Sequence, residues 1–280
     1  DIAGDQEMLD YYCPIANKAL GKLYTPIGAN TGDGHKMGLW VGGQMQTGPL
    51  PPMIHPQVNA YFHAAFLFLN TKGRRFMNES TWVQGKSLAI MNQPGGYAWA
   101  ICDANWLAQI KAGLPKGGGM FWDQFRFYPD PFDDATAQWQ MQNDLKSGNA
   151  VQANDLGQLA AEIRVDAATM AAEVARYNSL VDAGADPDFY KDPLFLGKIA
   201  DPPFIAMKVG PGLLAVVGGL TTNTALGVLD ADGNAIPGLY AVGNVAGGVF
   251  ANDYPINIPG CSHGRCLTWG YVVAESLASA

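Results

Sequence analysis

Apolar residues recur at helical spacing in several segments of the chain. The clearest segment carries them four, three and four residues apart, at Met170, Val174, Tyr177 and Val181. This spacing places them on one face of a helix. Asp166 is a typical N-cap and Gly184 a typical residue just past a helix end, so we predict a helix over 166–183. Other patterns predict helices over 6–12, 82–92, 154–163 and 262–276, and one that begins at Thr31 or Asp33.

Short apolar runs between turn residues predict strands, which alternate irregularly with the helices. The runs lie at 64–70, 74–78, 97–102, 213–217, 227–229 and 238–242. Prolines at 49, 51, 52 and 56 indicate one boundary, and a change of character near Pro202-Pro203 indicates another. The pattern therefore predicts an α/β or α+β protein in which 1–48 and 204–280 form one domain around an inserted lobe, 49–203.

Composition removes several classes of function. The 280 residues are 48% apolar and carry a net charge of −8 without any run of Lys or Arg, which argues against a nucleic-acid-binding face. No uninterrupted apolar stretch reaches the roughly 18 residues of a membrane span. The four cysteines (Cys13, Cys102, Cys261 and Cys266) are too scattered for a disulfide scaffold, and with the four histidines they form no ligand-spaced metal cluster.

Four motifs occur in the order of one enzyme family. Residues 236–248, I-P-G-L-Y-A-V-G-N-V-A-G-G, resemble the I-P-G-L-Y-A-A-G-E-x-x-G-G signature of the fumarate reductase and succinate dehydrogenase flavoproteins, which include flavocytochrome c fumarate reductases and ketosteroid dehydrogenases. Residues 31–34 (T-G-D-G), 69–79 (L-N-T-K-G-R-R-F-M-N-E) and 176–184 (R-Y-N-S-L-V-D-A-G) are similar to further family segments. Together the motifs cover nearly the whole chain.

The resemblance implies a partial, Rossmann-like FAD-binding domain with an inserted α+β capping domain. An FAD domain opens with a strand and a G-x-G-x-x-G turn that brings the pyrophosphate to a helix N-terminus, and this sequence has no such match. We therefore interpret the chain as a fragment that starts about midway through a longer protein. We expect FAD to be enclosed only when the missing N-terminal half is supplied.

The resemblance assigns cofactor contacts to four residues. The helix predicted to start near Ser262 and His263 would direct its N-terminus at the flavin, where free amides stabilise negative charge. Asn244 occupies the position of a family Glu that binds ribityl hydroxyls, and Asp33 would provide a polar contact from the other side. Alternatively the helix only packs, and Asp33 only caps its own helix.

Catalytic and substrate residues follow from the ketosteroid dehydrogenase branch, where Tyr-Pro precedes Pro-Gly. The branch implies that Tyr254 and Gly260 polarise a ketone, although the loop between them is two residues longer here. Tyr254 could instead be a packing residue. Arg265 is the alternative proton donor or anion clamp, unless it lies on the surface, and His55 is a candidate substrate contact.

In the fumarate reductases of this family, cationic residues bind the two carboxylates of fumarate. The resemblance places other residue types at these positions. The cationic positions fall on Trp82, Leu214, Ala215 and Asp253, so a dicarboxylate would lose charge-assisted hydrogen bonds. We expect an FAD-dependent enzyme that reduces or desaturates a C=C bond next to a carbonyl in a fairly apolar small molecule, an enoate, enone or ketosteroid, and not fumarate. The alternatives are a non-catalytic binding module and a domain that pairs with a separate FAD-binding subunit. The electron donor, the reaction direction and the compartment, cytoplasmic or exported, stay open.

Overall fold

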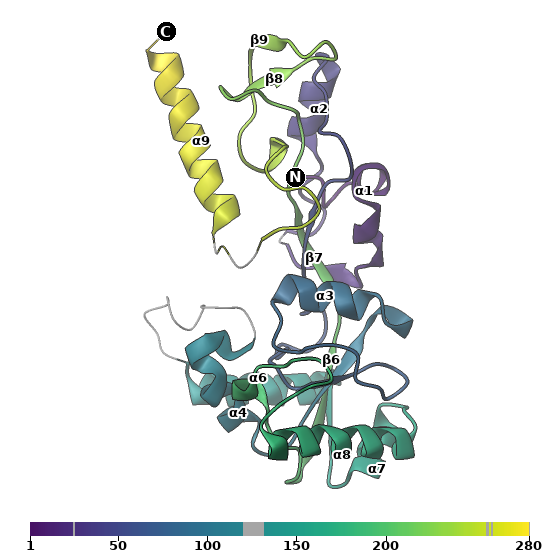
Figure 1. Cartoon of the computed structure of the whole chain (residues 1–280). Coiled ribbons are helices and arrows are strands. Elements are labelled where there is room, and N and C mark those ends of the chain that lie inside the picture. Colours follow the sequence, from purple (N-terminus) through teal and green to yellow (C-terminus); the bar gives the residue numbers. More distant parts are fainter. Residues whose placement is uncertain (25, 120–131, 256–257, 259, 280) are drawn as a thin grey trace. The chain divides into compact units, whose positions relative to one another are not determined.

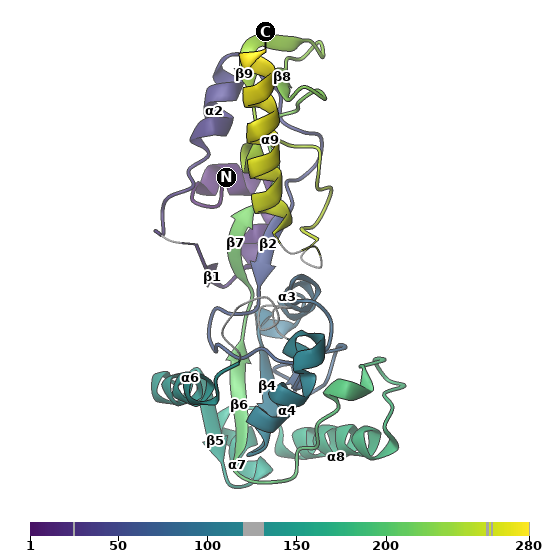
Figure 2. The ribbon, with the colours of Figure 1, turned by 90° about the vertical axis from the view of Figure 1, so that its left-hand side faces the viewer.

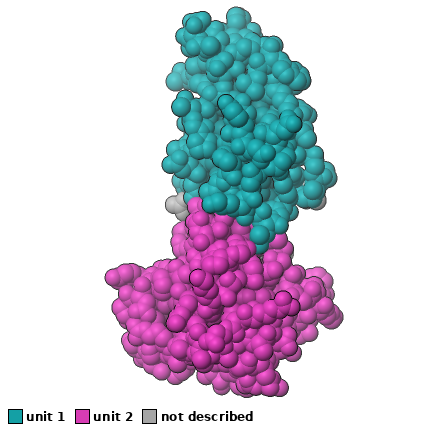
Figure 3. Space-filling model, turned by 90° about the vertical axis from the view of Figure 1, so that its right-hand side faces the viewer, with its two compact units in different colours: residues 1–54, 213–280 teal, residues 55–212 magenta. Residues whose placement is uncertain are grey.

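A computed structural model of the chain describes residues 1–24, 26–119, 132–255, 258 and 260–279. The chain divides into two compact units (Figure 3), residues 1–54 with 213–280 and residues 55–212, named here the first and second unit. The chain passes between them after Ile54 and after Gly212, a few residues later than the proline pattern predicts. Residues 204–209 belong to the second unit because they form a central strand of its sheet.

In its described residues, the first unit contains two small sheets and three α-helices. One sheet has the order β1 (Gly21–Lys22), β7 (Gly212–Val216), β2 (Pro52–His55), and the other pairs β8 (Gly227–Leu229) with β9 (Ala235–Tyr240). The helices are α1 (Gln6–Tyr12), α2 (Asp33–Trp40) and α9 (Cys261–Ala278). In Figures 1 and 2, α2 lies beside the hairpin of β8 and β9.

The helix starts of the first unit depend on one side-chain cap and two left-handed glycines. The Asp5 carboxylate caps α1 by accepting the Met8 N–H at 2.9 Å. Gly32 precedes α2 at φ 75°, and a Cβ there would lie 2.4 Å from the Met8 sulfur, so glycine is required on both counts. Gly260 precedes α9 at φ 73° and offers no side-chain cap.

The second unit is a four-stranded antiparallel sheet with helices on both faces. The strand order is β3 (Leu67–Leu69), β4 (Ala98–Cys102), β6 (Phe204–Val209), β5 (Ala150–Ala153). Alternate residues of β4 enter different cores. Ala98, Ala100 and Cys102 pack with α3 (Val83–Met91), α4 (Trp106–Gly113) and α6 (Asp134–Ser147). Trp99 and Ile101 pack with α7 (Leu156–Glu162) and α8 (Ala167–Ala183). Figure 2 shows α6 and α8 on opposite sides of this sheet.

The helices of the second unit are α3 (Val83–Met91), α4 (Trp106–Gly113), α6 (Asp134–Ser147), α7 (Leu156–Glu162) and α8 (Ala167–Ala183). Short 3-10 helices lie at Pro14–Lys18, Pro94–Gly96, Leu114–Gly119, Pro193–Phe195 and Gly243–Val245. The predicted helix over 166–183 is confirmed with its Asp166 cap, which accepts the Thr169 N–H at 2.8 Å.

The prediction of a strand over 74–78 is wrong. Only Arg75 makes a β-bridge, to Leu69, because the Asn70 side chain accepts backbone N–H groups of Lys72 and Arg74 and closes the segment into a turn. Segment 113–132 is rich in Gly and aromatic residues, a composition that predicts a loop; residues 120–131 lie outside the described residues, and 114–119 form a 3-10 helix. Within the described part, no helix is long and apolar enough to cross a bilayer.

Candidate functional site

The Gly-rich segment 243–248 of the first unit is held by a dense set of hydrogen bonds. The Leu220 N–H donates to Val245 O and the Gly247 N–H donates to Leu220 O, both at 2.8 Å. The Gln46 Oε1 accepts the N–H groups of Gly248 at 3.1 Å and Gly219 at 3.3 Å. These bonds fix the backbone on both sides of Ala246, beginning at the residue directly after Asn244.

His35, in the first turns of α2, connects this segment to a second loop. His35 is 1% exposed, and its Nε2 lies 3.0 Å from Gly218 O. Burial lowers the pKa of His35. A Cβ on Gly219 would lie 2.2 Å from Val245 O and 2.6 Å from the His35 Nε2, so only glycine admits this approach.

Four of the predicted site residues meet at the N-terminus of α9. The Ser262 N–H donates to the phenolic oxygen of Tyr254 at 3.0 Å. The Ser262 hydroxyl donates to Asn244 Oδ1 at 2.8 Å, and Arg265 Nη2 donates to the same oxygen at 3.1 Å. Tyr254, Ser262, Asn244 and Arg265 are named here the α9 cluster.

Arg265 is buried in this cluster, so the alternative that it lies on the surface is wrong. Its residue is 7% exposed, and its guanidinium carbon lies 4.9 Å from the Phe250 ring centre and 5.3 Å from that of Trp269. Arg265 Nη1 donates to Ala246 O at 3.4 Å, whereas Nε has no partner among the described residues. Burial lowers the pKa of Arg265.

Tyr254 lies in apolar surroundings. It is 5% exposed and packs with Met53, Val217 and Phe250, with Leu214 and Ala215 at the edge of the same core. Its only polar contact within the described part of the chain is the Ser262 N–H. Tyr254 thus combines packing in an apolar core with a position beside a helix N-terminus.

The other predicted site residues lie outside the α9 cluster. His263 and Gly260 are exposed at the start of α9, and Asp33 is exposed at the start of α2, where it accepts the Thr31 hydroxyl at 2.8 Å. His55 belongs to the second unit and is 7% exposed; burial lowers its pKa to about 4.

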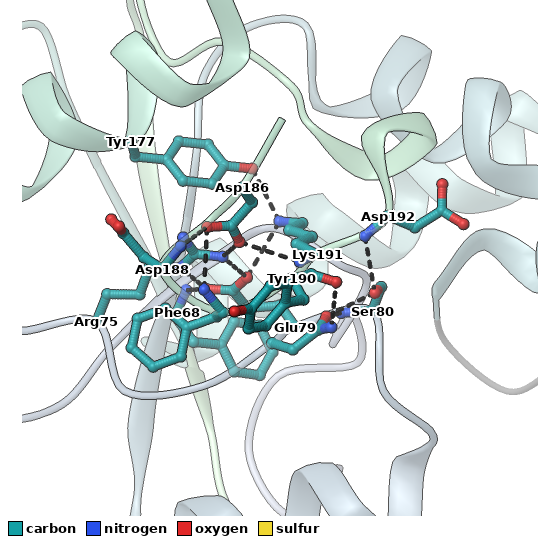
Figure 4. Close-up of polar contacts among 12 residues, drawn as sticks. Phe68, Arg75, Glu79, Ser80, Tyr177, Asp186, Asp188, Tyr190, Lys191 and Asp192 are labelled. Carbon is teal, nitrogen blue, oxygen red and sulfur yellow. Dashed lines mark hydrogen bonds and ion pairs between the residues drawn. The ribbon is translucent and has the colours of Figure 1, made fainter. Parts of the chain in front are cut away.

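The second unit holds a buried ionic cluster that the sequence reasoning missed (Figure 4). Arg75 donates two hydrogen bonds of 2.8 Å to Glu79 and one of 2.7 Å to Asp186. Lys191 Nζ lies 3.3 Å from Glu79 Oε2 and donates to the Tyr177 hydroxyl at 2.8 Å. The i,i+4 spacing of Arg75 and Glu79 within the R-F-M-N-E motif was the available signal.

The geometry of the ionic cluster indicates that it stabilises the fold of the second unit. The side chains of Glu79, Asp186 and Lys191 are fully buried, and the Arg75 guanidinium lies over the rings of Tyr177 and Phe189. The contacts tie the turn after β3 to α8 and to the segment 186–191. A buried Lys86 lies nearby, and burial lowers its pKa to about 7.

Comparison with known proteins identifies the family. The FAD binding domain family model matches residues 4–256. The chain belongs to this FAD-binding family. It is 31% identical over 211 residues to an NADH:acrylate oxidoreductase of Vibrio harveyi, covering 75% of this chain and 18% of that protein. It is 30% identical over 284 residues to a 3-oxosteroid 1-dehydrogenase of Mycobacterium tuberculosis, covering 89% of this chain and 46% of that protein.

Solved structures agree with this assignment. A flavocytochrome c3 fumarate reductase in its open conformation matches with a TM-score of 0.66 at 26% identity, over 97% of this chain and 43% of that one. A 3-ketosteroid delta1-dehydrogenase from Sterolibacterium denitrificans has a TM-score of 0.67 at 23% identity, which shows the shared fold. The chain covers 52% of that ketosteroid dehydrogenase chain and less than half of the other relatives and of the fumarate reductase structure.

The residues present fit part of an FAD site. An 18-residue helix begins after an exposed glycine without a side-chain cap. The Cys261 N–H donates to Ile258 O and the Ser262 N–H to Tyr254, so among the described residues the His263 N–H is the first-turn amide left available to an acceptor. The segment 243–248 brings backbone and the Asn244 amide to the same helix end. FAD is therefore supported as the cofactor. No group of three or more potential metal ligands occurs among the described side chains.

Proposed function

We propose that this chain is the C-terminal part of an FAD-dependent oxidoreductase that reduces or desaturates a C=C bond next to a carbonyl. The substrate is a fairly apolar enoate, enone or ketosteroid-like molecule and not fumarate. One observation carries the proposal: the Tyr254 phenol lies in an apolar core with its oxygen on the Ser262 N–H at the start of α9. The family and the dehydrogenase and reductase relatives support the reaction class.

Tyr254 is proposed as the proton donor or acceptor. Because its oxygen accepts the Ser262 N–H, the phenolic proton is directed elsewhere and remains available for transfer. The same N–H and the positive end of the helix stabilise the phenolate that remains after proton donation. Bound FAD supplies the hydride exchange. Gly260, exposed at the helix start, is proposed to polarise the substrate carbonyl through its backbone.

Substrate charge is limited by the residues around Tyr254. The positions that carry cations in fumarate reductases hold Leu214 and Ala215, which pack against the Tyr254 core, and Asp253, which is exposed. Placing two carboxylates against this apolar surface would cost the hydrogen bonds they make in water. An uncharged ring or a monocarboxylate avoids that cost.

The two units are proposed to divide the work. The first unit, predicted as residues 1–48 with 204–280, carries the flavin contacts Asp33, Asn244, Ser262 and His263. The second unit, predicted as 49–203, is proposed as the capping domain, and His55 as its candidate substrate contact. The missing N-terminal half of the FAD site comes from outside these 280 residues.

The test uses the protein expressed from its complete reading frame. Visible absorbance measures bound flavin, and oxidation of reduced viologen is followed with an enone steroid, an enoate and fumarate. We expect bound flavin and turnover of the enone or enoate at least about 10²-fold above fumarate, since a missing charge clamp costs several kcal/mol. Turnover of fumarate alone would contradict the substrate proposal. Absence of flavin would favour the alternative, a non-catalytic binding module.

A further inference from the structure

Two hydrogen-bond donors converge on one oxygen of Asn244. The Ser262 hydroxyl lies 2.8 Å and the Arg265 Nη2 3.1 Å from Oδ1. Since a guanidinium can only donate, the Asn244 atom that faces Arg265 must be the amide oxygen. The amide nitrogen therefore points away from both groups.

The Asn244 Nδ2 is available to donate hydrogen bonds to a ligand. No described group accepts a hydrogen bond from it, and Asn244 is partly exposed. A family Glu at this position would present only acceptors, whereas this Asn presents two N–H groups. A ligand that contacts Asn244 must therefore offer an oxygen or nitrogen lone pair.

Arg265 is held too firmly for proton transfer. It is enclosed by the Phe250 and Trp269 rings and donates to both Asn244 and the Ala246 carbonyl. A guanidinium also keeps its proton throughout the working range of proteins. Its contacts connect α9 to segment 243–248, and so they fix the Asn244 side chain in place.

We propose that Arg265 is a positioning residue, which locks the Asn244 amide as a hydrogen-bond donor toward an acceptor oxygen of the cofactor. The inference rests on the proposed function in taking FAD as that ligand. It replaces the prediction that Arg265 is a proton donor or anion clamp.

The test measures FAD affinity by fluorescence titration of the deflavinated protein from the complete reading frame. Arg265→Met keeps the side-chain length but removes the donors, and we expect FAD binding to weaken about tenfold, as for one lost hydrogen bond. Arg265→Lys, which can still donate to Oδ1, should recover most of the affinity. Arg176→Met, at an exposed ion pair with Asp188, is the matched control and should bind FAD as the wild type does.

Coupling between the two residues separates positioning from general destabilisation. If Arg265 acts through Asn244, the variant with both Asn244→Ala and Arg265→Met should bind FAD no more weakly than Asn244→Ala alone. At saturating FAD, Arg265→Met should lower kcat by at most about tenfold, well short of the 10²–10⁴-fold fall expected for a lost acid. Additive losses in the double variant, or unchanged FAD affinity with a collapsed kcat, would overturn the inference.

Further variants and the wild-type protein separate failure of this inference from failure of the proposed function. If Arg265→Met does not fold, the Lys variant and Asn244→Asp take its place. The carboxylate of Asn244→Asp can pair with Arg265 but cannot donate, so FAD should again bind about tenfold more weakly, and undiminished affinity would contradict the inference. Wild-type protein that binds FAD but reduces no test substrate would contradict the proposed function alone. Wild-type protein that binds no FAD would overturn both.

Discussion

The phenolic oxygen of Tyr254 accepts the backbone N–H of Ser262 at 3.0 Å. Gly260 gives α9 no side-chain cap, so Tyr254 supplies from the preceding loop a partner for one of the unsatisfied first-turn amides. The same contact holds the phenol at the positive end of an 18-residue helix. One hydrogen bond thus joins helix capping to the placement of the proposed acid.

Removing the Tyr254 hydroxyl tests its chemical role. Tyr254→Phe should lower kcat by about 10²–10⁴-fold, the usual contribution of a general acid, while flavin content stays unchanged. Steady-state kinetics with the preferred enone or enoate checks this. Tyr271→Phe is the matched control, because Tyr271 lies on the same helix but is 68% exposed. Full activity of the Tyr254 variant would remove this residue from the mechanism.

The buried ionic cluster of the second unit predicts a large stability effect. Glu79→Gln leaves Arg75 and Lys191 without one of their carboxylates inside the protein. Breaking a buried pair by removing one partner typically costs about 3–5 kcal/mol of unfolding free energy. Denaturant unfolding of the second unit measures the loss. Arg74→Gln, at the half-exposed pair with Glu173, should change little, and equal effects of both variants would contradict this account.

Stability should also fall in mild acid because of His55. Burial lowers its folded-state pKa to about 4, below the ordinary value of 6.5, so the unfolded chain takes up the proton first. The contribution is present above about pH 6.5 and is lost as pH falls towards 4, by about 3 kcal/mol in all. His55→Gln should flatten this part of the stability profile, measured by thermal unfolding from pH 7 to 4. An unchanged profile would place the pKa of His55 near its ordinary value.

Local patterns predicted the elements whose signals lie within a few residues. The Asp166 cap and the Gly184 stop predict α8 at almost its observed bounds, the predicted segment 6–12 matches α1, and the helix predicted from about Ser262 begins one residue earlier, at Cys261. The motif order predicted the family. By contrast, α6 was missed because its apolar stripe is weak: only Ala137, Met141 and Asp144 are buried along its 14 residues.

Contacts between distant segments could not be predicted in this way. Motifs indicate Tyr254, Ser262 and Asn244 one by one. Only the fold brings Ser262 and Arg265 together, so that both donate hydrogen bonds to Asn244 Oδ1. Gln46 carried no signal at all, because an isolated glutamine acquires its role only when Gly219 and Gly248 approach it. Asp186 joins Arg75 across 111 positions of sequence, beyond the range of any local pattern.

Gly243 and Gly248, at the two ends of the site segment, offer a matched pair for the last prediction. Both have positive φ, 70° and 81°, but an added Cβ would lie 2.7 Å from the Cys266 sulfur at Gly243 and would meet nothing within 4 Å at Gly248.

Gly248→Ala should therefore cost about 1–2 kcal/mol, the strain of a left-handed alanine. Gly243→Ala should cost a further 1–3 kcal/mol, because the added methyl overpacks the contact with α9. The free energy of unfolding measures both. If the Cys266 sulfur is responsible, the change Gly243→Ala made in a Cys266→Ala background should cost no more than Gly248→Ala. The next nearest atom is the Cys266 Cβ at 3.6 Å, an ordinary van der Waals distance. If Gly243→Ala still lowers the free energy of unfolding more than Gly248→Ala in the absence of the sulfur, α9 does not pack on this segment through Cys266. The contacts from which the roles of Asn244 and Arg265 are argued would then be less well supported.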